Sequence, residues 1–185
     1  MFTKPVLDGR HTAEISDDGV VVFLIGMRFN RWWRVDKWGF VFFDMLRMLR
    51  YLARGDEGLL HSRYWFGRTL ILVQYWRSVD ELNAFATNQK APHAATWRKF
   101  NRRIGADGTV GIYHETYKVL PGNSECMYVN MPAFGLGAAT GPIIVDRSRD
   151  RADQRMARQR PTSGRPGTQR RGTHGGVDAE RKLAG

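Results

Sequence analysis

Cysteine is almost absent from this sequence of 185 residues, in which Cys126 is the only one. A single cysteine excludes an internal disulfide and a cysteine-based zinc cluster, so we expect a reducing compartment and a cytoplasmic protein. Histidine is also sparse, because the five histidines are scattered and form no close His-x-x-x-His pair. We therefore expect no zinc site.

Long hydrophobic runs are missing as well. The N-terminal residues contain no apolar segment of the signal-peptide type, and no window reaches the roughly 18 uncharged residues that a membrane-spanning helix needs. We expect neither a signal peptide nor a membrane span. The overall composition, with 42% apolar and 12% aromatic residues, nevertheless suffices for the core of one domain.

The net charge of +11 is unevenly distributed along the chain. From Arg147 to the last residue there are eleven basic and four acidic residues, so most of the excess positive charge lies there. The segment is rich in Arg, Gly and Gln and offers little apolar surface to bury, which predicts a disordered basic tail over residues 146–185. We expect this tail to be solvated, with no specific nucleic-acid partner.

The hydrophobic pattern between the two ends predicts one α+β domain over residues 19–145, preceded by a polar N-terminal arm over residues 1–18. Ser78-Val-Asp-Glu81 is a capping box, which marks the start of a helix. We expect strands at 20–27, 59–66, 69–76 and 110–117, and helices at 38–54, from 79 and at 92–104. The order β-α-β-β-α-β is that of the ferredoxin-like unit.

Alternation along the expected strands assigns side chains to the two faces of the sheet. In strand 69–76, one face carries Leu70, Leu72, Gln74 and Trp76, and the other carries Ile71, Val73 and Tyr75. Apolar residues on both faces predict a central strand. Since the helices of a ferredoxin-like unit cover one face only, we expect the other face to pack against a second copy of the chain in a homodimer.

Two further segments leave alternatives open. The segment 28–38 interleaves three tryptophans with basic residues, which suits either a membrane surface or an anionic ligand, or else a connection whose indole rings cover one end of the core. The glycine-rich segment 123–145 is expected to form a lid over a pocket or to wrap around a partner subunit.

Five sequence motifs resemble an uncharacterised monooxygenase-like family, named for its similarity to a small monooxygenase of fumagillin biosynthesis. They are Met27-Arg-Phe-Asn30, Leu72-Val-Gln-Tyr-Trp-Arg-Ser78, Phe85-Ala with His93 and Trp97-Arg-Lys-Phe100, Gly111-Ile-Tyr-His-Glu-Thr-Tyr117 and Tyr128-Val-Asn-Met-Pro132. More distantly, the pattern is similar to the antibiotic-biosynthesis monooxygenase superfamily. That resemblance implies a dimeric α+β barrel with a cavity between helices and sheet in each subunit.

The resemblance also implies the chemistry to look for. Some members of the superfamily oxidise aromatic, polyketide-like substrates without a cofactor, which requires a base and a dry cavity. His93 and His114 are the candidate bases, and Glu115 is expected to orient a histidine or to act as the base itself. The expected substrate-binding residues are Trp97, Tyr75, Trp76, Phe100, Arg68 and Asn130.

Three functions remain open at this point. The first is a monooxygenase that oxidises an apolar, aromatic molecule without an organic cofactor. The second is a haem-binding or haem-degrading protein, since relatives bind haem through a histidine on the second helix, where His93 lies, and Arg47, Arg68 or Arg98 could meet the propionates. The third is a non-enzymatic module that binds a hydrophobic ligand.

Overall fold

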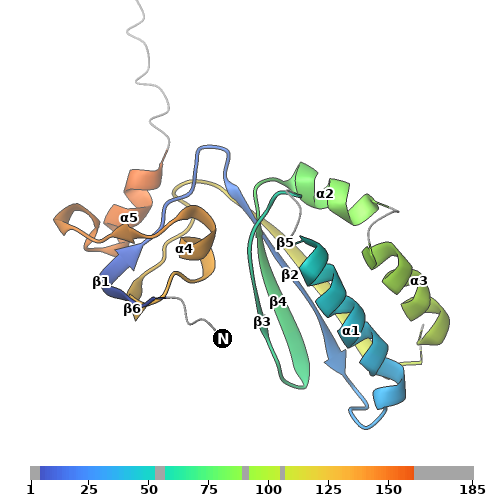
Figure 1. The fold of residues 1–185 in the computed structure, drawn as a ribbon. Helices are drawn as coiled ribbons and strands as arrows, with labels where there is room; N and C mark the ends of the chain where they lie inside the picture. The colour runs from blue at the N-terminus through green and yellow to red at the C-terminus, as the bar shows by residue number, and fades with distance from the viewer. Residues whose placement is uncertain (1–4, 53–56, 89–91, 105–106, 161–185) are drawn as a thin grey trace, which may run out of the picture.

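The computed structural model describes residues 5–52, 57–88, 92–104 and 107–160, and of residues 46, 48, 49, 52 and 92–97 it describes the backbone alone. Within these ranges the chain forms two units. The larger is a sheet with helices on one face, and the smaller lies on the other face of that sheet (Figure 1).

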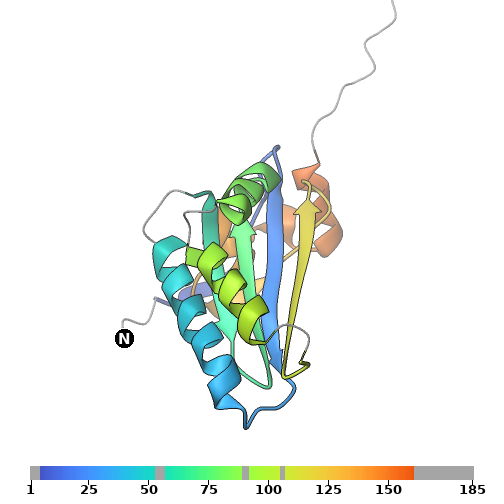
Figure 2. The same ribbon diagram turned by 90° about the vertical axis from the view of Figure 1, so that its right-hand side faces the viewer.

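The larger unit is a four-stranded antiparallel sheet in the order β3-β4-β2-β5, covered by three helices. Its elements are β2 (Val20–Phe29), α1 (Val35–Leu52), β3 (Leu59–Trp65), β4 (Thr69–Trp76), α2 (Val79–Thr87), α3 (Pro92–Arg103) and β5 (Val110–Val119). The three helices lie on one face of the sheet, as Figure 2 shows from the helix side. The expected α+β fold with a ferredoxin-like order of elements is confirmed.

Local sequence signals explain how this unit is built. The backbone N–H of Glu81 donates to the Ser78 hydroxyl over 3.1 Å, so the predicted cap starts α2. Strand β4 alternates buried and half-buried residues, and it lies between β3 and β2 as a central strand. The prediction that alternate residues of β4 lie on opposite faces of the sheet is therefore confirmed.

Two clusters of buried side chains join the helices to the sheet. The α2 cluster consists of Val21, Trp76, Leu82 and Phe85. The α3 cluster consists of Met27, Val41, Leu70, Phe100, Ile104 and Val110. Each cluster holds one end of the helix-covered face, and the middle of the sheet lies between them.

The second unit was not expected as such. It is a three-stranded sheet in the order β6-β1-β7 with short helices around it. Its elements are β1 (Leu7–Thr12), β6 (Tyr128–Met131), α4 (Gly135–Thr140), β7 (Ile143–Ile144), η1 (Arg147–Arg149) and α5 (Ala152–Gln159). Residues 7–12, predicted to be part of a polar arm, are thus a strand, because β6 and β7 supply backbone partners on both of its sides.

This second unit covers part of the sheet face that the helices leave free. Ala13, Ile15 and Leu136 pack there on Val20, with Tyr75 and other half-buried residues around them. The glycine-rich segment 123–145 therefore packs on the sheet of its own chain. The second unit thus covers the end of this face near Val20 and contacts β3 through Phe134, and packing against a second copy of the chain stays a prediction.

The expected boundary at residue 146 also differs from the structure. Helix α5 follows it, and Arg155 at the centre of this helix is buried. The Arg155 guanidinium is held by the Glu125 carboxylate and by the carbonyl oxygens of Arg149 and Asp150. Polar contacts rather than apolar burial order this segment, which is why its composition misled the prediction. Residues 161–185 of the predicted tail lie outside the described residues.

Candidate functional site

The middle of the helix-covered face, between the two clusters, carries one amide and one imidazole side chain among apolar ones. We call it the mid-sheet row and define it as Phe23, Ile25, Leu72, Gln74 and His114, from β2, β4 and β5. Backbone pairing aligns Ile25 with Leu72 on one side and with His114 on the other, and aligns Phe23 with Gln74. Paired residues of adjacent strands share a face, so these five side chains emerge on the helix side.

Gln74 is the one polar residue on this face of β4, and it is almost fully buried, with 2% of its surface exposed. Its amide oxygen accepts a hydrogen bond of 2.9 Å from the indole N–H of Trp76, which is fully buried. This bond fixes the orientation of the amide. Among the described residues no acceptor meets the amide NH2 group, so it is the donor that a bound molecule can use.

His114 lies on β5, the edge strand of the sheet, and its side chain is exposed. The centre of its ring is 5.9 Å from the centre of the Phe23 ring, which flanks it on the same face. Within the described residues the imidazole makes no hydrogen bond. Its ring nitrogens are therefore open to a hydrogen-bond partner from outside the described residues.

Glu115 does not lie near the imidazole of His114. The two residues are consecutive in β5, so their side chains leave the sheet from opposite faces. The Glu115 carboxylate instead accepts a hydrogen bond of 2.6 Å from the Tyr117 hydroxyl. This bond raises the pKa of Tyr117, because the neighbouring carboxylate disfavours the tyrosinate. Glu115 therefore does not orient His114, and its predicted role, to orient another histidine or to act as the base itself, stays a prediction.

Of the other predicted site residues, Trp76 is in the α2 cluster and Phe100 in the α3 cluster, so both belong to the core. Arg68 is exposed in the turn between β3 and β4, where its Nε donates to the carbonyl oxygen of Phe29 over 3.4 Å. Asn130 lies in the second unit, with φ +50°, and its side-chain oxygen accepts from the backbone N–H of Gly9 over 2.9 Å.

His93 and Trp97 both fall in α3, which passes over the sheet on the same side as the mid-sheet row. Their side chains are outside the described part of the structure, so their predicted roles remain predictions. Of the three arginines named for a haem propionate, Arg47 and Arg98 are exposed on α1 and α3, and Arg68 is in the distant turn.

Tyr75 points away from the mid-sheet row, toward the contact between the sheet and the second unit. Burial raises the pKa of the Tyr75 hydroxyl, and the nearby Cys126 adds to this. Burial likewise raises the pKa of Tyr128, whose hydroxyl oxygen accepts from the backbone N–H of Gly137 over 3.1 Å. The raised pKa values favour the neutral hydroxyl in both, and the hydrogen bond between Tyr128 and Gly137 joins β6 to α4 within the glycine-rich segment.

Gln74 is not among the predicted site residues, although the sequence carries a signal for it. A single amide in the alternating series Leu70, Leu72, Gln74 and Trp76 interrupts an otherwise apolar face, and a buried polar group needs a partner. Phe23 offered no comparable signal, since every side chain of strand 20–25 is apolar.

The described residues hold no group of three or more side chains suited to a metal ion, and none of their helices is both long and apolar enough to cross a membrane. An antiparallel sheet in ferredoxin-like order, with three helices on one face and polar groups set into that face, defines a ferredoxin-like α+β protein. A family model described as monooxygenase af470-like matches residues 20–136. The chain belongs to this monooxygenase-like family.

A curated relative supports the same assignment. The protein named monooxygenase af470 from Aspergillus fumigatus is 31% identical to this chain over 166 residues. The match covers 81% of this chain but 56% of the relative, so the chain spans little more than half the length of that protein.

Proposed function

We propose that this protein is a small monooxygenase that oxidises an apolar, aromatic or polyketide-like molecule without a bound organic cofactor. The observation that carries the proposal is the position of His114: an imidazole without a hydrogen-bond partner among the described residues, beside Phe23 on the helix-covered face. Membership of a monooxygenase-like family supports oxygen insertion as the reaction type.

The proposed reaction requires a general base from the protein. A hydroxyanthrone, which is an aromatic ketone with an acidic methylene group, loses a proton from that carbon to the His114 imidazole. The carbanion passes an electron to O2, and the two radicals combine into a C–O bond. The imidazolium returns the proton to the distal oxygen, and the hydroperoxide then loses water, so that one oxygen atom stays in the product as a ketone and the other leaves as H2O.

The rest of the mid-sheet row has a supporting role in this proposal. The amide NH2 group of Gln74 donates to the oxygen on which negative charge develops when the substrate is deprotonated, and Trp76 holds that amide in place. Phe23 offers a flat apolar surface to the aromatic substrate. His93 stays a proposed second base, contributed by α3.

An oxygen electrode tests the proposal. The full-length protein, treated with a chelator, is expected to consume O2 in proportion to the hydroxyanthrone oxidised and faster than buffer does. Saturable binding of the same molecule without any O2 consumption would instead indicate a ligand-binding module.

A haem titration separates the remaining alternative. The proposed function predicts no specific Soret band when haem is added to the purified protein. A saturable band that the His93→Ala variant lacks would assign a haem-binding function with His93 as the axial ligand, and would contradict the cofactor-free reaction.

We also propose that the protein is a homodimer through the sheet face that the second unit leaves uncovered. Leu24, Ile71 and Val73 are half-buried there, and Trp65, which packs edge to face against Phe134 of the second unit, is still 45% exposed. Sedimentation equilibrium is expected to give the mass of two chains, and Val73→Asp to give one. A wild-type protein with the mass of a single chain would refute this association.

A further inference from the structure

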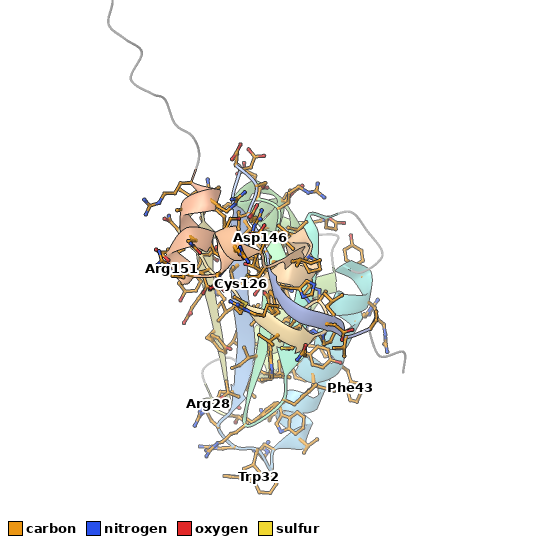
Figure 3. All side chains as sticks on the ribbon, turned by 90° about the vertical axis from the view of Figure 1, so that its left-hand side faces the viewer. Arg28, Trp32, Phe43, Cys126, Asp146 and Arg151 are labelled. Carbon is orange, nitrogen blue, oxygen red and sulfur yellow. The ribbon has the colours of Figure 1, made fainter. Side chains whose placement is uncertain are left out.

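One end of the molecule carries large aromatic side chains in water. Trp32 and Trp33 are 66% and 61% exposed in the loop between β2 and α1, and Phe43 of α1 is 69% exposed. Phe66, at the tip of the β3–β4 hairpin, is 57% exposed. We call this region the aromatic end. In Figure 3, Trp32 lies at the extremity of the molecule opposite to Cys126, Asp146 and Arg151 of the second unit and its connection.

Contacts between the segments link the hairpin turn to the start of the loop and to α1. The backbone N–H of Phe29, just before the loop, donates to the carbonyl oxygen of Arg68 in the hairpin turn over 2.9 Å. The Phe42 ring links the hairpin to α1, with its centre 5.4 Å from that of Phe66 and 5.7 Å from that of Phe43. The hairpin tip is therefore joined both to the start of the loop and to the aromatic rings of α1.

The tryptophans of the loop are not needed to cover the core. Trp38 does that task, since its ring is half-buried against Phe29 at 4.6 Å between centres. The indole N–H of Trp38 donates to the carbonyl oxygen of Trp32 over 2.9 Å, which anchors the loop from below. Trp32 and Trp33 pack only edge to face on each other, at 6.3 Å, and point outward. The interpretation that all three indole rings close the core is thus wrong for two of them.

The same end carries a positive charge. The exposed Arg28, Arg31 and Arg68 form no ion pair within the described residues. The acidic residues nearby are already paired: Asp36 with Arg34 at 2.7 Å, and Asp107 with Lys37 at 3.2 Å. Arg34 lowers the pKa of Asp36, and the backbone N–H of Thr109 together with Lys37 lowers the pKa of Asp107, so both carboxylates are charged. An approaching surface therefore meets three uncompensated arginines around the aromatic rings.

We propose that the aromatic end docks the protein onto an anionic lipid bilayer. Tryptophan favours the boundary between headgroups and acyl chains, and arginine favours anionic headgroups, so both features fit the same partner. The rings project from a loop and a hairpin tip, a shape that enters a soft surface. Charge complementarity selects an anionic bilayer over a neutral one. This attachment is independent of the proposed reaction, but an apolar substrate dissolved in the bilayer would meet the protein there.

Vesicle sedimentation of the full-length chain tests the proposal. Wild-type protein is expected to sediment with vesicles of phosphatidylcholine and phosphatidylserine, and much less with phosphatidylcholine alone. Trp32→Ser with Trp33→Ser should lower the partition coefficient roughly tenfold or more, since two large apolar side chains are lost. Arg28→Gln with Arg31→Gln should lower it about fivefold for each arginine.

The matched control lies at the opposite end of the molecule. Ile144, which is 71% exposed, and Arg147 provide an apolar and a basic residue in the second unit, and Ile144→Ser with Arg147→Gln is expected to bind like wild type. All variants keep the basic residues 161–185, so any contribution of that segment is constant. Circular dichroism verifies that each variant is folded.

Three results would overturn the proposal. The first is equal binding of the wild type and both aromatic-end variants. The second is an equal loss of vesicle binding in the Ile144→Ser, Arg147→Gln control, which would show that binding does not depend on the aromatic end. The third is a change of sedimentation-equilibrium mass in the tryptophan variant, which would make the aromatic end a protein contact. As a second readout, lipids brominated in the acyl chain should quench wild-type tryptophan fluorescence more than that of the tryptophan variant.

Discussion

His114 and Glu115 are consecutive in β5, yet they serve opposite faces of the sheet. His114 is aligned with Ile25 on the face that the helices cover, whereas the Glu115 carboxylate accepts the Tyr117 hydroxyl on the other face. A histidine that is oriented by its neighbouring carboxylate is therefore not what this strand provides. If His114 is the base, it acts without Glu115.

The first prediction follows from this separation. His114→Ala should lower kcat by about 10²–10⁴-fold, which is the usual contribution of a general base. Glu115→Gln should change kcat less than about threefold, because the carboxylate lies on the opposite face. Oxygen consumption with a hydroxyanthrone measures both. A large loss in Glu115→Gln with an active His114→Ala would reverse the assignment.

The second prediction concerns the pair of Gln74 and Trp76. Gln74→Leu should lower the free energy of unfolding by about 1–3 kcal/mol, because the buried indole N–H loses its acceptor. Trp76→Phe should lower the free energy of unfolding less in the Gln74→Leu variant than in the wild-type protein. In that variant the indole N–H that the substitution removes already has no acceptor. Urea denaturation of the four proteins gives this coupling. Strict additivity would mean that the hydrogen bond contributes nothing to stability.

The third prediction tests the close approach of strands at Gly26. A Cβ atom there would lie 2.0 Å from the backbone carbonyl oxygen of Leu70, which cannot move without shifting the sheet, and 2.9 Å from the Tyr113 ring. Gly26→Ala should therefore destabilise the fold by about 3 kcal/mol. Gly111→Ala is the control, because the nearest atom to its Cβ is 3.7 Å away. Equal denaturation midpoints for the two variants would contradict the register of β2 with β4.

The order of the main unit was predictable because each of its signals is local. Period-two alternation predicted the two faces of β4, and the Ser78 capping box predicted the start of α2. The second unit gave no such signal. Strand β1 shows an exposed Gly9 and Arg10, and it is stabilised by partners more than a hundred residues away. Single-sequence patterns do not report pairing at that distance.

The candidate site was predictable in part. Alternation along β5 separates His114 and Glu115 onto opposite faces, so their adjacency in sequence does not give them a shared role. Asn130 was selected from a motif and Arg68 as a basic residue near the expected site, and the structure places them in the second unit and in a hairpin turn. Arg155 escaped prediction because it is buried by hydrogen bonds, whereas its charge suggested exposure.

The fourth prediction uses the raised pKa of Tyr128. Burial favours the neutral hydroxyl in the folded state, so the folded-state pKa lies above the unfolded value of about 10. Its contribution is fully present below pH 10 and is lost as the pH rises toward the folded-state pKa. Tyr128→Phe should lower stability at pH 7 by about 1 kcal/mol, through the lost partner of the Gly137 N–H, yet lose less stability than wild type above pH 10.

The control for this alkaline effect is Tyr64→Phe. Tyr64 is 50% exposed, so its removal should leave the alkaline dependence unchanged. Urea denaturation between pH 8 and pH 11 measures all three proteins. Parallel curves for wild type and Tyr128→Phe would refute the account of this buried hydroxyl.

The fate of molecular oxygen tests the central claim most directly. The chelator-treated, full-length protein is incubated with a hydroxyanthrone under ¹⁸O2, and the product is analysed by mass spectrometry. The account predicts one labelled oxygen atom in the new ketone of each product molecule and labelled water as the co-product, with no added flavin, haem or metal. An unlabelled ketone, hydrogen peroxide in stoichiometric amount, or a reaction that starts only when a cofactor is added would contradict it.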